Sequence, residues 1–220
     1  MTSSHSEVLV RKTPPFVVPL SVIRLPLALK LAAKAQASTS STGALLQDKF
    51  SKAVFRLLHR KLNLPARGIM ELNTPDGPKR LPFDARNTHY QGVFLTGLEL
   101  GYEASTLALL DILTADNGVF YDVGGNFGYF SLCLAARPGY GGHIHTFEPH
   151  PMSFAELQAH INASGLKARI TPHAIALSNE NGTGRLRIDA LHSALAKLTD
   201  GADGVDVPAV VRAVEGLARS

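Results

Sequence analysis

The apolar positions recur at helical spacing in two segments before residue 119, and the pattern changes beyond it. From Leu45 to Leu62 they recur at helical spacing, with Lys and Arg on the other face, which predicts an amphipathic helix. Segment 68–83 has two weak strands around Pro75-Asp76-Gly77, which predicts a hairpin. Segment 102–118 returns to helical spacing, and its closing Asn117-Gly118 favours a left-handed cap.

Beyond residue 119, short apolar runs alternate with helical segments. Strands are expected at 119–123, 141–149 and 168–178, helices at 127–136 and 153–166, and a further short strand at 182–188. This βαβαβ order predicts an α/β fold with a Rossmann-like, doubly wound, mainly parallel sheet. Pro172 implies an edge position or a bulge, and Ser153 with Glu156 has the spacing of a capping box.

Three regions follow from these patterns. Residues 1–44 are expected to be a flexible basic or amphipathic extension and linker, 45–118 a helix-hairpin-helix part, and 119–220 a partial Rossmann-like domain. The apolar stretch Phe16–Ala37 is interrupted by charges and prolines, which argues against a signal peptide or a membrane span. Two interpretations of it stay open: a segment resting on a membrane surface or partner, and a loosely docked extension, which we favour.

Composition narrows the function classes. The 220 residues carry a net charge of +4, and this excess is spread thinly over the chain without a dense basic run, so no nucleic-acid partner is expected. The single cysteine, Cys133, excludes an intrachain disulfide and is typical of a reducing compartment, which predicts a cytoplasmic location. Because Cys133 lies in an apolar run, burial is expected rather than nucleophilic chemistry.

Acidic residues and glycines meet where the first two predicted parallel strands end. Asp122 ends the first strand, Gly124, Gly125 and Gly128 follow it, and Glu148 ends the second strand 26 residues after Asp122. Ligands of parallel sheets bind at this edge, where a carboxylate can accept hydrogen bonds from ribose hydroxyls. The helix that begins near Asn126 is expected to point its free amides at the ligand.

The ligand chemistry follows from the loop. Its glycines lack the G-x-G-x-x-G spacing of dinucleotide-binding proteins, and an acid before the loop repels phosphate. S-adenosylmethionine carries an ammonium group, a sulfonium and a ribose but no phosphate, so it is favoured over NAD. A nicotinamide-dependent dehydrogenase remains a distant third interpretation.

Three sequence blocks carry a family resemblance. "FYDVGGNFGYFSL", "HTFEPHPMSFAELQAHI" and "AIALSNENGTGRL" resemble, in order and spacing, the motifs of FkbM-type S-adenosylmethionine-dependent methyltransferases, a class I Rossmann-like family. Gly125 stands where that family usually has alanine, and Asn179 where it commonly has an acid.

The resemblance implies roles for specific residues. Asp122, Gly124 and Gly125 are implied to hold the methionine end of the cofactor, and Glu148 the ribose hydroxyls. The turn into the helix is implied to be shaped by Asn126, Phe127 and Gly128. The nucleoside is implied to lie beside Phe147 and Pro149, and the adenine edge, more weakly, beside Ser178 and Asn179. Glu103 matches an acid found before the first strand in that family, without an assigned role.

Simpler interpretations accompany these. The glycines could form only a strand-to-helix turn, and Phe127, Tyr129 and Phe130 are expected in the core because they lie in an apolar helical run. His143 and His145 share one face of a strand, but without a third ligand no metal site is expected. The other histidines of this region are expected at the surface or in supporting positions: His150, His160 and His173.

The resemblance ends before the C-terminus. The family's fourth strand carries an "I-K-I-D-V-E-G"-like block near the acceptor, and no such block is present here, which makes this chain resemble a truncated member. Without that strand, the strand 119–123 keeps an exposed edge, so poor stability and self-association are expected.

The sequence supports two alternative functions. The first is an S-adenosylmethionine-dependent methyltransferase whose acceptor, as the resemblance implies, is a hydroxyl of a small molecule or glycan; no general base can be named. The alternative is a non-catalytic or degenerate cofactor-binding module that lacks the acceptor site.

Overall fold

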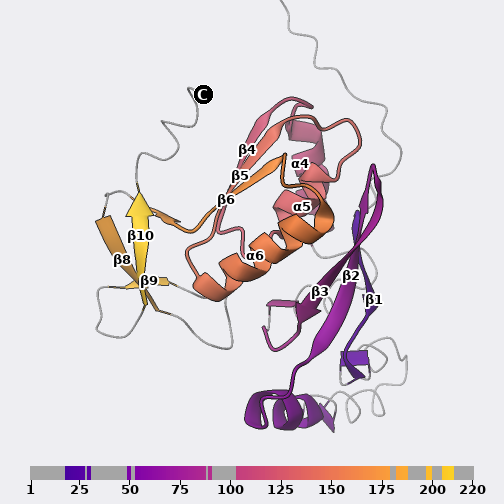
Figure 1. Ribbon diagram of the computed structural model, residues 1–220, viewed down its shortest axis with the longest axis vertical. Coiled ribbons are helices and arrows are strands. Elements are labelled where there is room, and N and C mark those ends of the chain that lie inside the picture. The colour runs from indigo at the N-terminus through magenta and orange to yellow at the C-terminus, as the bar shows by residue number, and fades with distance from the viewer. Residues whose placement is uncertain are drawn as a thin grey trace, which may run out of the picture.

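The structure is a computed structural model that describes residues 18–27, 29–30, 49–50, 53–87, 89–90, 103–178, 182–187, 197–199 and 205–210. These residues form three separate sheets and a set of helices (Figure 1). Among the described helices, none combines the length and the apolar character that crossing a bilayer requires.

The first sheet is antiparallel and has the order β1-β2-β3, formed by Leu20–Arg24, Arg67–Thr74 and Gly77–Asp84. The predicted hairpin is confirmed, and Gly77 adopts a φ of +98°, which the tight turn requires. Strand β1 pairs with β2 although these residues were expected to be part of a flexible extension, so that expectation is wrong for 20–24. The alternating burial of β2 gives this sheet one face for the core.

The helical segments before the parallel sheet differ in detail from the prediction. The helix expected over 45–62 ends as the π-helix η1, Arg56–Lys61, and buries Phe55 rather than Leu57, which is exposed. Residues Leu45 and Leu46 lie outside the described part. Helix α4, Ala104–Leu113, ends before the expected cap, and Gly118 instead donates to the carbonyl of Ala115 in a turn.

The predicted βαβαβ unit is confirmed as a parallel sheet of order β4-β5-β6. Its strands are Val119–Val123, His143–Phe147 and Ile170–His173, joined by α5, Tyr129–Ala135, and α6, Pro151–Ser164. Among the described strands, β6 lies at an edge of this sheet, which is one of the two positions that Pro172 predicted, because proline cannot donate to a further strand.

In the described part of the chain, the three helices α4, α5 and α6 lie on one side of the parallel sheet (Figure 1). Strands that follow one another in chain order take right-handed crossovers, which place α5 and α6 on the same face. On the other face, Val119 and Val123 of β4 are 53% and 62% exposed. The described fold is therefore α/β with a singly covered parallel sheet, whereas a doubly wound sheet was expected.

A third sheet has the order β7-β10-β8-β9, with bounds Ala176–Leu177, Val205–Val210, Gly182–Arg187 and Lys197–Thr199. Strand β7 is parallel to β10, which is antiparallel to β8. The strand expected over 168–178 is thus split: its first part pairs with β5 and its last part joins the third sheet.

The main core joins the first sheet to the parallel sheet through α6. Fully buried Met70, Leu72 and Leu81 belong to the same cluster as Leu157 and Ile161 of α6. Cys133 is buried, as expected, and burial raises the pKa of its thiol, so the thiolate is disfavoured.

Candidate functional site

The loops after β4 and β5 meet at the carboxyl edge of the parallel sheet. The backbone N–H groups of Gly124 and Gly125 both donate to the carbonyl oxygen of Phe147, at 2.9 and 3.1 Å. The glycine loop is therefore fixed against the end of β5, and it brings Asp122 and Glu148 to the same edge, as the strand order predicted.

Glu148 connects the two loops through its carboxylate. Its Oε2 accepts from the N–H of Asn126 and its Oε1 from the N–H of His150, both at 2.8 Å. The side chain is 6% exposed. Burial raises the pKa of Glu148, the charge of Asp122 raises it further, and the two backbone hydrogen bonds lower it. A carboxylate has about four lone-pair positions, so this one keeps acceptor capacity for a ligand.

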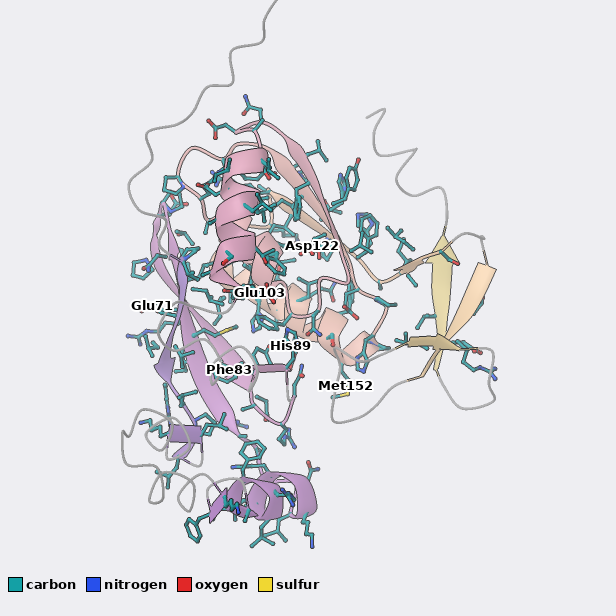
Figure 2. The ribbon with its side chains drawn as sticks, turned by 180° about the vertical axis from the view of Figure 1, so that it is seen from behind. Glu71, Phe83, His89, Glu103, Asp122 and Met152 are labelled. Carbon is teal, nitrogen blue, oxygen red and sulfur yellow. The ribbon has the colours of Figure 1, made fainter. Side chains whose placement is uncertain are left out.

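Asp122 lies near the end of β4, just before the glycine loop, and its side chain is on the face of the sheet that the helices cover (Figure 2). Its Oδ2 accepts a hydrogen bond of 2.5 Å from the hydroxyl of Ser131 in α5. Burial raises the pKa of Asp122, and the Ser131 contacts lower it. Asp122 therefore supports the loop from inside the protein as well as contributing negative charge.

The three loop glycines serve different purposes. Gly124 has a φ of +79°, and a Cβ at this position would meet nothing within 4 Å, so its Cα borders open space. A Cβ on Gly125 would lie 2.0 Å from Oγ1 of Thr146, and one on Gly128 would lie 2.7 Å from Cδ1 of Leu157. Gly124 thus leaves room for a ligand, whereas Gly125 is required by packing against Thr146 and Gly128 is favoured by its φ of +93°.

The expectation that the helix offers free amides here is wrong for most of the loop. The N–H groups of Gly124, Gly125 and Asn126 donate to Phe147 and Glu148, and Gly128 donates to Gly125 at 2.7 Å. Helix α5 begins only at Tyr129. The loop therefore does not resemble a phosphate-binding nest, because such a nest turns these amides toward the ligand.

Positive charge is scarce around the site. Arg137 is the sole Lys or Arg between residues 119 and 166. It follows the last turn of α5, where it pairs with Asp111 and Asp116 at 3.3 and 3.2 Å. The site consequently combines two carboxyl groups with a loop that lacks cations, which favours a cationic ligand over a phosphate.

The aromatic candidates behave as packing residues. Phe127 is fully buried, with its ring 4.5 Å from that of Tyr90, and Tyr129 is buried in the same cluster, which confirms the expectation of a core role. Phe147 is 1% exposed and stacks on the ring of His173 with 4.7 Å between ring centroids. Pro149 is half-buried next to Glu148.

The two adenine-edge candidates are not brought to the loop by the parallel sheet. Ser178 follows β7, which pairs with β10 of the third sheet. Asn179 lies outside the described residues.

Sequence reasoning missed two supporting residues, Ser131 and Thr146, and did not define the role of His150. His150 is the N-cap of α6, where its Nδ1 accepts from the N–H of Ser153 at 3.3 Å. The predicted capping box is therefore wrong, although Pro151 in the first turn was a usable signal for this start. Ser131 and Thr146 act on Asp122 and Gly125, and no local pattern indicates such contacts.

The histidines divide into buried and half-buried groups. His150 and His160 are buried, which fits the supporting position rather than the surface position that was expected for them, and His160 approaches the carbonyls of Phe127 and Pro82 at 3.1 and 3.0 Å. On the open sheet face, Nδ1 of His145 lies 3.1 Å from Nε2 of His173. No group of three or more His, Cys, Asp or Glu side chains within the described residues is arranged to hold a metal ion.

Comparison with known proteins gives a distant structural likeness. No family model matches the chain, and no curated protein matches it. Among solved structures, a protein described as a transferase, PH0793 of Pyrococcus horikoshii, matches 49% of this chain and 36% of its own, with 13% identity and a TM-score of 0.34. TYW2 of P. horikoshii, solved in complex with MeSAdo, matches 51% of this chain and 42% of its own, with 11% identity and a TM-score of 0.33.

The chain thus spans about two fifths of the length of these structures. Over about half of the chain, the fold is distantly similar to these two structures. The ligand is inferred below from the chain's own residues.

Proposed function

We propose that the carboxyl edge of β4 and β5 binds S-adenosylmethionine and that the chain is, or derives from, a methyltransferase. The observation that carries the proposal is Glu148. Its carboxylate is fixed at the end of β5 by N–H groups of Asn126 and His150, next to the open Cα of Gly124. A fixed carboxylate at this place in a parallel sheet is suited to two adjacent ribose hydroxyls.

The charges support this ligand over a dinucleotide. Asp122 and Glu148 each have a pKa raised mainly by burial, so a bound cation would offset the cost of their negative charge. The ammonium and sulfonium groups of S-adenosylmethionine supply such charge. A pyrophosphate would instead face two carboxyl groups and a loop whose amides are already used.

The proposed reaction is a displacement at carbon. When bound, S-adenosylmethionine would supply a methyl group on a positively charged sulfur; an acceptor oxygen would displace S-adenosylhomocysteine from that methyl carbon and would lose its proton to a base. Alignment of acceptor and methyl group supplies much of the rate in such a reaction. The resemblance of three sequence blocks to FkbM-type enzymes supports a hydroxyl of a small molecule or glycan as acceptor. The single cysteine, which is buried and reduced, supports a cytoplasmic location of the protein.

Titration calorimetry of the full chain with S-adenosylmethionine, S-adenosylhomocysteine and NAD tests the proposal. We expect binding of the first two, and we expect Gly124→Ala to weaken it because the new Cβ enters the ligand space. Gly139→Ala is a matched control, since Gly139 also has a positive φ, +82°, and also has nothing within 4 Å of a new Cβ. Equal weakening by both changes would trace the effect to backbone strain and contradict the proposal.

A second pair of variants tests the carboxylate. Glu148→Gln should weaken binding, whereas Glu71→Gln on β2 should not, because Glu71 belongs to the first sheet. Binding of NAD in preference to S-adenosylmethionine would favour the dehydrogenase. Absence of binding by a folded chain would favour the non-catalytic module.

A further inference from the structure

The charge of the chain is strongly divided along its length. Residues 1–70 contain eleven Lys or Arg and two acids, Glu7 and Asp48, whereas residues 71–220 contain eleven Lys or Arg and sixteen Asp or Glu. The net charge of +4 is therefore the sum of a basic N-terminal part and an acidic remainder, which corrects the expectation of a thinly spread excess. A charge asymmetry of this size indicates an acidic partner for the N-terminal part.

The described N-terminal residues also expose apolar side chains beside these cations. Leu27, Phe50, Leu57 and Leu62 are 73%, 64%, 52% and 59% exposed. We call the following set the basic apolar surface: Leu27, Phe50, Leu57, Leu62 and Leu64, with the exposed cations Arg24, Lys30, Lys49, Arg56 and Lys61. No acidic side chain occurs among the described residues from 18 to 70.

The members of the basic apolar surface lie at one end of the molecule. The short turn that contains Leu27 and Lys30 and the helix η1 both occupy the lower end in Figure 1. Their inward side chains share the main core, in which Leu29 and Phe55 are 3% and 5% exposed. The two segments are thus anchored by buried residues while their remaining apolar side chains face outward.

Hydrogen bonds fix the exposed leucines in place. The ring of His59 lies 2.8 Å from the carbonyl oxygen of Leu64, and the N–H of Leu62 donates to the carbonyl of Leu57. Arg86, at the end of the first sheet, donates to the backbone carbonyl and to Oδ1 of Asn63 at 3.2 and 2.7 Å. Leu62 and Leu64 therefore flank Asn63, which is hydrogen-bonded to Arg86 at the end of the first sheet.

From this juxtaposition we propose that the basic apolar surface docks the protein on an anionic lipid bilayer. Exposed Leu and Phe side chains interleaved with Lys and Arg fit the boundary between acyl chains and anionic headgroups. Exposed apolar groups that gather at one place mark protein or membrane contacts. RNA is less suited to this surface, because single strands are bound by stacking on aromatic rings, whereas these exposed side chains are mostly aliphatic.

Vesicle flotation of the full chain tests the proposal directly. We expect binding to phosphatidylcholine vesicles that contain phosphatidylserine, weakened by added salt, and much weaker binding to phosphatidylcholine alone. Arg56→Glu and Lys61→Glu should each weaken binding about fivefold or more, because each replaces a cation of the basic apolar surface by an anion that the anionic lipids repel. Lys167→Glu, an exposed cation after α6, is the control and should have little effect.

A tryptophan reporter tests insertion separately from charge. The chain contains no tryptophan, so Leu62→Trp introduces a single fluorophore at an exposed position. Its emission should shift to the blue when phosphatidylserine vesicles are added, whereas Leu113→Trp, placed at a 72% exposed leucine on α4, should not shift. Circular dichroism confirms that both variants are folded.

Three outcomes would overturn the proposal. They are equal binding to both kinds of vesicle, unshifted emission of Leu62→Trp on vesicles that bind the chain, and tighter binding to a single-stranded RNA homopolymer than to the anionic vesicles. Since none of these measurements involves S-adenosylmethionine, the result is independent of the proposed function.

Discussion

Glu148 accepts a hydrogen bond from the backbone N–H of Asn126, across 22 positions of sequence, at 2.8 Å. The same carboxylate accepts from the N–H of His150, the N-cap of α6. One side chain therefore joins the loop after β4 to the start of the second crossover helix. The geometry of the candidate site and the packing of α6 depend on the same group.

The first prediction concerns the stability supplied by this connection. Glu148→Gln replaces one acceptor oxygen by an NH₂ group, which would face a backbone N–H that then lacks an acceptor. Leaving a buried donor unsatisfied costs about 1–3 kcal/mol, so the free energy of unfolding in urea should fall by that amount. Glu71→Gln should change it by less than about 0.5 kcal/mol. An unchanged value for Glu148→Gln would show that the two hydrogen bonds contribute nothing net.

The second prediction concerns Gly125, where the resembling family usually has alanine. A Cβ there would lie 2.0 Å from Oγ1 of Thr146, so Gly125→Ala should destabilise the chain by about 1–3 kcal/mol through overpacking. The hydroxyl of Thr146 is buried without a hydrogen-bond partner among the described residues. Thr146→Ala removes this unpaired hydroxyl together with one buried methyl group, so alone it should cost about 1 kcal/mol, and in combination it should offset much of the destabilisation by Gly125→Ala.

A double-mutant cycle in urea measures this coupling. Thr146→Val is the control, since it keeps a branched side chain near the new Cβ and should not rescue Gly125→Ala. Additive effects of Gly125→Ala and Thr146→Ala would contradict the proposed contact.

The local order of strands and helices could be predicted where the sequence pattern is strong. The hairpin turn at Gly77 and the strand 119–123 follow from turn chemistry and from short apolar runs, and both were placed correctly. The meeting of Asp122 and Glu148 at one edge followed from the parallel arrangement alone.

The remaining features depend on contacts between distant segments. Strand β1 forms because β2 offers a partner, and its own sequence reads as a proline-interrupted extension. The strand expected over 168–178 is divided after His173 because its last part pairs with β10, about thirty residues later in the chain. Likewise, Ser153 and Glu156 have capping-box spacing, but Glu156 instead accepts from Asn87 and Tyr90 of the N-terminal part. Such tertiary partners are not visible in local periodicity.

The third prediction concerns the pH dependence of stability. Burial lowers the pKa of His160, while the nearby carbonyls of Phe127 and Pro82 raise it without offsetting the burial. The folded state then binds fewer protons than the unfolded state, whose histidine has a pKa of about 6.5. The stability that His160 contributes is therefore complete above that pH and is lost as the pH falls below it.

Unfolding in urea between pH 5 and pH 8 tests this for His160→Gln. The variant should be less stable than the parent above about pH 7, and the gap should narrow below about pH 6.5. Leu157→Ala, another buried residue of α6, does not titrate, so its gap should stay constant with pH. A gap for His160→Gln that widens toward acid pH would mean that the buried ring is protonated.

The last prediction concerns the open edge of β4. Within the described residues, β4 pairs with β5 on one side only, and Val119 and Val123 are exposed on the face opposite the helices. An unpaired apolar edge can accept a strand from a second copy, so the chain should associate as its concentration rises. Val119→Lys and Val123→Lys should reduce this association, because a charge at an edge is costly to bury.

Light scattering over a concentration series, with urea unfolding of the same variants, separates association from folding. The two lysine variants should scatter less while their unfolding free energy stays within about 0.5 kcal/mol of the parent, since both positions are exposed. Leu109→Lys, at a 55% exposed leucine of α4, should leave the association unchanged. If the parent chain is monomeric throughout and unfolds cooperatively, the edge is protected, and the expectation of self-association fails together with that of poor stability.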